Sequence, residues 1–262
     1  RGIVNRMRIA RFKRDLYDFW LDMEVLNGLL DSVPDSSTRY ARILEGLVKV
    51  TNIFKDAEAN VGQCREMLPP LLQQSANASA PTINAVGHAH IDTGWLWPVR
   101  ETIRKSARTF ASQLDLMERY PEYVFGASQP QHYQFVKDHY PELYEKIREA
   151  VAGGRWELQG GMWIEPDCNL ISGESMVRQI LHGKNFFMDE FGVDVNNCWI
   201  PDVFGYSASM PQILKLGGLE HFLTQKMSWS QFNRFPYSTF RWRGIDGTEV
   251  LTHFPPEDTY NS

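Results

Sequence analysis

Cysteine is scarce in this chain of 262 residues, which holds only Cys64, Cys168 and Cys198. The three lie far apart, form no C-x-x-C pair and are odd in number, so a disulfide framework is not indicated. A reducing compartment is the simpler inference, and we expect a cytoplasmic protein. The chain has no run of 18 apolar residues and no charged-then-apolar leader, so no membrane partner is expected. Because it begins on Arg1 rather than Met, a leader removed before this point stays open.

Neither sign of charge dominates the composition. The 27 Lys and Arg residues nearly balance the 32 Asp and Glu residues, for a formal net charge of −5. A mildly acidic chain lacks the electrostatic footprint of a nucleic-acid-binding protein, so we expect no nucleic-acid partner. Aromatic residues are plentiful instead, with 8 Trp and 10 Tyr. They fit either a rich core or a cleft in which flat rings stack on sugars.

Several catalytic motifs are absent as well. The chain contains no H-E-x-x-H, no G-x-S-x-G, no G-x-x-x-x-G-K-[ST] and no G-x-G-x-x-G. These absences set aside four classes: metalloproteases of the first pattern, serine hydrolases with a nucleophile elbow, P-loop proteins and dinucleotide-binding proteins.

The first part of the chain has the periodicity of helices. Apolar residues spaced by three and four predict a long amphipathic helix from residue 9 to 26, and a second stripe follows between residues 40 and 54. A third helix is predicted at 57–67, ending before Pro69-Pro70. The small polar stretch 73–81 is typical of a linker. We therefore predict a helical N-terminal region over residues 1–79.

From residue 80 to 262 the pattern changes to short apolar runs that alternate with helices. The predicted strands are 82–87, 123–127, 156–159, 197–200 and 222–224, and the predicted helices are 99–120, 132–152, 174–191 and 210–216. Repeated strand-helix units indicate an α/β fold with a parallel sheet or barrel. The runs on either side of Asp246-Gly247 predict a closing β-hairpin.

Charged side chains follow the first predicted strand of this second region. His88, His90 and Asp92 are spaced by two, so in an extended chain all three project from the same face. Imidazole nitrogens and a carboxylate oxygen suit zinc or a similar divalent ion. The alternative is that the histidines belong to the core and Asp92 caps a helix.

Other strand ends carry candidates too, because active groups in such folds gather at the carboxyl ends of the strands. Asp202 follows an apolar strand and fits a nucleophile, a further metal ligand or a helix cap. Glu165 and Asp167 fit either an acid/base carboxylate or charged loop residues. Lys226 fits either a contact to substrate oxygens or a solvated lysine.

Four stretches together resemble the family-38 glycoside hydrolases, the class II α-mannosidases, and most of all their cytosolic and bacterial branch. They are HAHIDTGWLWPVRET at 88–102, GGMWIEPDCN at 160–169, WIPDVFGYSASMPQIL at 199–214 and FLTQKMSW at 222–229. The resemblance implies a (β/α)7-barrel-like catalytic domain over residues 80–262, incomplete at its C-terminus. It also implies a retaining exo-α-mannosidase that hydrolyses terminal α-linked mannose from glycans.

The resemblance also implies roles for individual residues. His90 and Asp92 match two ligands of the family's metal, which is zinc, cobalt or another divalent ion. Asp202 matches the residue that both binds this metal and acts as the nucleophile, whereas His88 fits the motif without being a ligand. The remaining matches are substrate contacts, three aromatic and one basic: Trp95, Phe204, Tyr260 and Lys226.

The family chemistry needs more groups than these. A retaining glycosidase uses a nucleophilic carboxylate and a second carboxyl group about 5–5.5 Å away as acid/base. In the family, the acid/base aspartate and a fourth ligand, a histidine, lie in a part of the chain that would follow Ser262. We therefore expect the isolated 262-residue chain to be inactive.

Two other hypotheses stay open at this point. A metal-dependent amidohydrolase or deacetylase would need both His88 and His90 as ligands, with His221, His253 and Asp202 completing the site. A metal- or sugar-binding fragment without activity is the non-enzyme alternative. The expected partner is a mannose-containing glycan, and assembly into homo-oligomers is left open.

Overall fold

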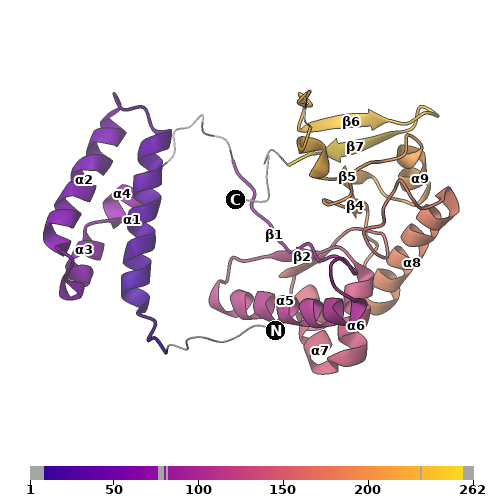
Figure 1. Cartoon of the computed structure of the whole chain (residues 1–262), viewed down its shortest axis with the longest axis horizontal. Helices are drawn as coiled ribbons and strands as arrows, with labels where there is room; N and C mark the ends of the chain where they lie inside the picture. Colours follow the sequence, from indigo (N-terminus) through magenta and orange to yellow (C-terminus); the bar gives the residue numbers. More distant parts are fainter. Residues whose placement is uncertain (1–8, 76–79, 81, 231, 256–262) are drawn as a thin grey trace. The chain divides into compact units, whose positions relative to one another are not determined.

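The computed structural model describes residues 9–75, 80, 82–230 and 232–255. The chain divides into two compact units between Ile83 and Asn84, labelled by their elements in Figure 1. Each unit is considered by itself below. Within the described residues, no helix is long and apolar enough to cross a membrane.

The N-terminal unit is helical, as the periodicity predicts. Its elements are α1 (Arg14–Ser32), α2 (Thr38–Phe54), the 3-10 turn η1 (Glu58–Asn60), α3 (Val61–Glu66) and α4 (Pro69–Leu72). Their buried faces share one apolar core, formed by Phe19, Leu26, Ile43, Leu47, Val50, Val61, Cys64 and Leu68. The first predicted stripe begins too early, because α1 starts at Arg14 and the preceding Ile9 and Phe12 are exposed.

Local signals explain where these helices start. Ser37 precedes α2, and its hydroxyl accepts a hydrogen bond from the backbone N–H of Tyr40 at 3.1 Å, which satisfies one of the free donors of the first turn. Pro69, placed by the prediction after the last helix, instead begins α4. Proline suits that first position, where its missing N–H costs nothing.

The second unit is a mixed α/β fold. Its elements are β1 (Gly87–His88), α5 (Val99–Arg119), β2 (Phe125–Ala127), α6 (Pro130–His139), α7 (Pro141–Ala152), β3 (Trp156–Leu158), α8 (Gly173–Phe191), β4 (Asn197–Trp199), α9 (Met210–Leu216), β5 (His221–Leu223), the 3-10 turn η2 (Lys226–Ser228), β6 (Thr239–Arg243) and β7 (Glu249–His253). The described strands form two sheets, in the orders β1-β2-β3 and β4-β5-β7-β6. All neighbours are parallel except β6 and β7, which form the predicted hairpin. The parallel α/β prediction is confirmed, and the seven-stranded barrel stays a prediction.

One predicted helix is wrong in its extent. Residues 132–152 form parts of two helices, α6 and α7, which are separated at Tyr140. Tyr140 has φ −142° and ψ 61°, outside the helical region. The break follows from Pro141, which disfavours a helical conformation in the residue before it and lacks the N–H that a continuous helix needs.

Aromatic side chains from β3 and from helices α5 and α6 form part of one buried core. Trp156 of β3 is 2% exposed and donates its indole N–H to the hydroxyl of Tyr133 at 2.8 Å. That hydroxyl donates in turn to the carbonyl of Ala127 at the end of β2, at 3.0 Å. The ring of Phe110 meets Trp156 edge to face, with centroids 5.0 Å apart. These contacts fix the ends of β2 and β3, from which two site loops begin.

The loop after β3 crosses close to the ends of neighbouring strands. Gly160 donates its backbone N–H to the side-chain oxygen of Asn197 in β4 at 2.9 Å, which ties the two sheets together. Its φ is 99°, and an added Cβ would lie 2.2 Å from the carbonyl oxygen of Ser128. Only glycine fits this crossing, where the loop after β3 passes Ser128 beyond the end of β2 and Asn197 at the start of β4.

Candidate metal centre

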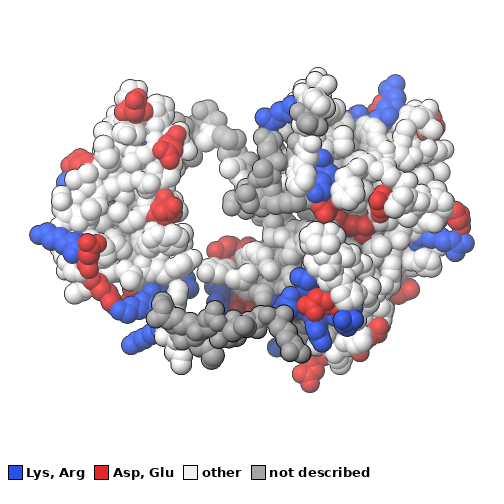
Figure 2. All heavy atoms as spheres, viewed as in Figure 1, with Lys and Arg blue, Asp and Glu red and all other residues white. Residues whose placement is uncertain are grey.

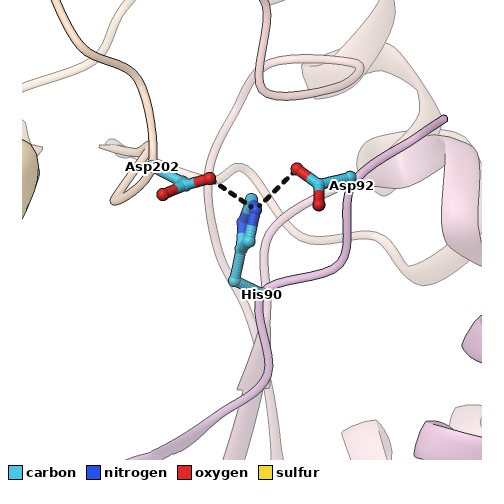
Figure 3. Close-up of side chains that lie close together, drawn as sticks. All are labelled: His90, Asp92 and Asp202. Carbon is cyan, nitrogen blue, oxygen red and sulfur yellow. Dashed lines mark hydrogen bonds and ion pairs between the residues drawn. The ribbon is translucent and has the colours of Figure 1, made fainter. Parts of the chain in front are cut away.

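Three side chains from two strand ends converge in the second unit. His90 and Asp92 follow β1, and Asp202 follows β4. The Nε2 atom of His90 lies 3.2 Å from Asp92 Oδ1 and 3.2 Å from Asp202 Oδ2, as Figure 3 shows. One ligand atom of each residue lies within 4.8 Å of the others. In the described part of the chain, this is the single group of three or more His, Cys, Asp or Glu residues arranged to share a metal ion.

The donor set fits a metal. One imidazole nitrogen and two carboxylate oxygens are ligands that zinc and similar divalent ions accept. Burial by itself lowers the pKa of His90, but the hydrogen bond and charge of Glu165, with the charge of Asp202, outweigh it and raise this pKa to about 9. The surrounding carboxylates thus favour a positive charge at this point. A divalent cation would supply that charge in place of the proton.

Glu165 completes the surroundings of His90 from the loop after β3. Its Oε1 lies 3.0 Å from His90 Nδ1, on the ring nitrogen that does not face the aspartates. The Glu165 side chain is only 5% exposed. Burial raises the pKa of its carboxyl group, whereas the hydrogen bond and charge of His90 act in the opposite direction.

His88 does not join the ligand cluster. Its Nε2 lies 3.3 Å from the hydroxyl oxygen of Ser128, and its ring lies 5.0 Å from the ring of Trp199. Burial, followed by the charge of His90, lowers its pKa to about 4. His253 is engaged elsewhere, with Nδ1 2.8 Å from the hydroxyl oxygen of Thr239.

Lys226 contacts the candidate nucleophile. Its Nζ lies 2.8 Å from Asp202 Oδ1, and its side chain is 10% exposed. The ammonium also lies 3.6 Å from the ring centroid of Trp229 and 5.7 Å from that of Phe204. The interpretation of Lys226 as a solvated lysine is therefore wrong. Sequence reasoning did not single out Trp229, although it ends the FLTQKMSW stretch.

A small cavity of about 110 Å³ opens beside the cluster. It is lined by His90, Asp92, Glu165, Asp167, Asp202, Val203 and Phe204. In Figure 2, acidic atoms gather in a recess on the visible face of the second unit. The cavity therefore combines negative charge with one aromatic wall.

The other site residues predicted from the sequence lie at different positions relative to this cavity. Phe204 is 68% exposed and belongs to the cavity wall. Trp95 is 65% exposed, packs edge to face on Trp97 at 5.2 Å, and is not part of that wall. Tyr260 lies outside the described residues. Asp167 accepts the backbone N–H of Asn169 at 2.9 Å, which shapes its own loop.

A parallel α/β unit with a His-Asp-Asp cluster at its strand ends is typical of a metal-dependent hydrolase. The sequence model described as "Glycosyl hydrolases family 38 N-terminal domain" matches residues 80–262, and the chain belongs to this family.

Individual relatives agree with the family assignment. The chain is 44% identical over 258 residues to "Alpha-mannosidase 2C1" of Homo sapiens, covering 98% of this chain and 25% of the relative. It is 50% identical over 263 residues to "Alpha-mannosidase G" of Dictyostelium discoideum, covering 99% of this chain and 24% of the relative. It thus spans about a quarter of the length of these relatives.

A solved structure is also similar. The crystal structure of an α-mannosidase from Enterococcus faecalis V583 matches with a TM-score of 0.57 and 28% sequence identity. The match covers 64% of this chain and 19% of that one.

Proposed function

We propose that this chain carries the nucleophile and three metal ligands of a retaining exo-α-mannosidase, which hydrolyses terminal α-linked mannose from glycans. The observation that carries the proposal is the convergence of His90, Asp92 and Asp202 at two strand ends of a family-38 chain. The mannosidase names of the relatives support the substrate class.

The proposed cofactor is a divalent metal, zinc or cobalt, held by His90, Asp92 and Asp202. When bound, such an ion would orient the sugar through its hydroxyl groups and stabilise charge in the transition state. The two carboxylates and the one neutral imidazole would give the site a net charge that suits a divalent cation.

Asp202 is the proposed nucleophile. Its Oδ1 is held by Lys226 and its Oδ2 faces His90, so both oxygens are oriented before substrate arrives. Attack of the carboxylate on the anomeric carbon would break the glycosidic C–O bond and form a covalent glycosyl-enzyme, while the acid/base group gives its proton to the leaving oxygen. Water, deprotonated by the same group, would then displace Asp202 and release mannose with retention. Pre-oriented groups lower the entropic cost of reaching the transition state.

The acid/base group is proposed to come from outside these 262 residues, together with a fourth ligand, a histidine. The relatives are about four times as long as the chain, which leaves ample sequence to supply both. Glu165 is engaged with His90, and Asp167 is engaged in its own turn. The proposal therefore expects no turnover from residues 1–262 alone.

The remaining assignments follow the same proposal. Residues 80–262 would form part of a (β/α)7-barrel catalytic domain preceded by a helical region, 1–79. The proposed substrate contacts are aromatic side chains and one lysine: Trp95, Phe204, Tyr260 and Lys226. The three cysteines are free and buried, which supports a cytoplasmic location.

The test uses the full-length protein and an aryl α-mannoside. Asp202→Ala should abolish mannose release, whereas Asp189→Ala, an exposed aspartate on α8, should leave it unchanged. Persistent activity of Asp202→Ala would refute the nucleophile assignment. Deacetylation of an N-acetylated sugar with no mannoside cleavage would favour the deacetylase alternative.

A further inference from the structure

His90 can bind the metal only through Nε2, and the availability of that nitrogen depends on where the ring hydrogen sits. Nε2 faces Asp92 and Asp202, whereas Nδ1 faces Glu165 Oε1 at 3.0 Å. A neutral imidazole carries one hydrogen, on either nitrogen. If Nδ1 carries it and donates it to Glu165, the lone pair of Nε2 is directed at the metal position.

We propose that Glu165 is a positioning residue that fixes the tautomer and ring orientation of His90 for metal binding. The inference rests on the metal-dependent function proposed above. Metal-bound histidines commonly donate their second N–H to a carboxylate, and loss of such an outer partner typically weakens metal binding about 10–100-fold.

Glu165 is itself held in place from the end of β2. Its Oε1 lies 3.4 Å from Gln129 Nε2 and 3.5 Å from the hydroxyl oxygen of Ser128. The backbone N–H of Glu165 donates to Gln129 Oε1 at 3.3 Å. A carboxylate that is 5% exposed and held by several donors has little freedom to turn. It therefore offers His90 one fixed acceptor.

Gln129 also connects the two segments that must stay aligned. Its Nε2 donates to the carbonyl of Ile91 at 2.9 Å, directly between the two ligands His90 and Asp92. Its Oε1 accepts the backbone N–H of Glu165 and the hydroxyl of Thr93. One buried amide thus clamps the ligand segment to the carboxylate that orients it.

This geometry distinguishes positioning from the acid/base role that the sequence left open for Glu165. The carboxylate lies behind the imidazole, on the nitrogen opposite the aspartates, and does not belong to the group that could share a metal. Its hydrogen bond to His90 would be lost if Glu165 served as a proton donor to the substrate. The structure therefore assigns Glu165 the role of orienting His90, not that of a proton donor to the substrate.

The test measures zinc binding by the full-length protein, by competition with a chelator. Glu165→Ala should weaken zinc binding about 10–100-fold. Glu165→Gln, which keeps the shape but loses the charge, should weaken it less. Glu157→Gln, an exposed glutamate in β3, is the matched control and should bind zinc as the wild type does.

A second measurement separates positioning from mere structural support. In the metal-free protein, at a pH where His90 is neutral, ¹⁵N chemical shifts of its ring should report one tautomer, with the hydrogen on Nδ1. Glu165→Gln should yield a mixture, because an amide either accepts from or donates to Nδ1. Should Glu165→Ala fail to fold, the shape-conserving Gln variant decides the question.

The outcomes are distinguishable. If Glu165→Gln keeps wild-type zinc affinity and a single tautomer but loses all turnover, the inference is overturned in favour of an acid/base role. If the wild type binds zinc yet releases no mannose, the proposed function fails. The zinc affinities of the Glu165 variants still test the positioning role in that case.

Discussion

Both units of this chain carry exposed ion pairs, but they differ in whether charged side chains also pair in buried surroundings. In the helical unit, ion pairs such as Lys13–Glu58 and Arg14–Asp18 lie on the outside of the helices, with well-exposed lysine and arginine side chains. In the α/β unit, Lys226–Asp202 and His90–Glu165 are largely buried at strand ends. Amphipathic helices turn their charges outward, whereas parallel strands bring several loops to one edge.

The comparison teaches where chemistry can arise in such a chain. Within the described residues, the shared-metal cluster lies in the α/β unit alone. The segments that follow β1 to β5 contribute to the cluster or support it, and residues of β2 to β5 belong to buried apolar cores. The described part of the helical unit has a core of its own but no comparable convergence of side chains.

The largest effect is expected in the core that supports the site. Trp156→Ala should lower the free energy of unfolding by about 3–5 kcal/mol, because it leaves a cavity and removes a partner of Tyr133. Urea unfolding followed by circular dichroism measures the change. Trp20→Ala, at a half-exposed position in the helical unit, should have a much smaller effect. Equal losses would break the distinction between the supporting core and the surface.

The next largest effect concerns the proposed metal ligands. His90→Ala should lower zinc affinity more than the ~10–100-fold expected for losing an outer partner. His88→Ala should have little effect, because His88 bonds Ser128 and lies outside the cluster. Metal content after dialysis, measured by mass spectrometry, compares the two variants. Equal loss from both would support the amidohydrolase hypothesis instead.

A smaller effect is expected at the start of α2. Ser37→Ala should destabilise the protein by about 1 kcal/mol, because the N–H of Tyr40 loses its acceptor. Ser37→Asp should preserve most of the stability, and Ser36→Ala is the matched control. Thermal unfolding of the three variants measures the difference. A control as damaging as Ser37→Ala would exclude the cap as the cause.

The smallest effect is expected for the exposed charges of the helical unit. Lys13→Ala should cost less than about 1 kcal/mol, and the loss should shrink further at high salt. Denaturant titrations at two salt concentrations provide the measurement. A loss of several kcal/mol that does not respond to salt would show that this pair contributes like a buried one.

Much of the fold was predictable because local signals were strong. The Asp246-Gly247 turn predicted the β6–β7 hairpin, and Gly247 has the positive φ of 87° that such a turn requires. Met210–Leu216 forms the helix predicted at those residues. The predictions of helix bounds failed where the apolar periodicity extended beyond the residues at which a helix begins or ends. The stripe through Ile9 and Phe12 extended beyond the helix, and Pro141 divided one apolar pattern into two helices.

For the site, spacing drew attention to His88, His90 and Asp92, and the family resemblance selected His90, Asp92 and Asp202, which the tertiary structure brings together. Spacing also placed His88 on the same face, whereas the family resemblance left it out of the ligands. The structure agrees with the second expectation, because His88 contacts Ser128 and does not belong to the cluster. Lys226 was expected to contact substrate, and the structure adds its direct contact with Asp202.

The sequence by itself determined the helical lead-in, the alternation of strands and helices, and the residue types that fit a metal-dependent glycosidase. Periodicity, helix caps and motifs depend on residues close together in the sequence, so they can be recognised from the sequence alone. Only the tertiary structure decided that Asp202 meets His90, that Lys226 contacts Asp202, and that Glu165 and Gln129 contact the segment that carries His90 and Asp92. Such contacts join residues far apart in sequence, and the packing of strand ends alone sets their distances.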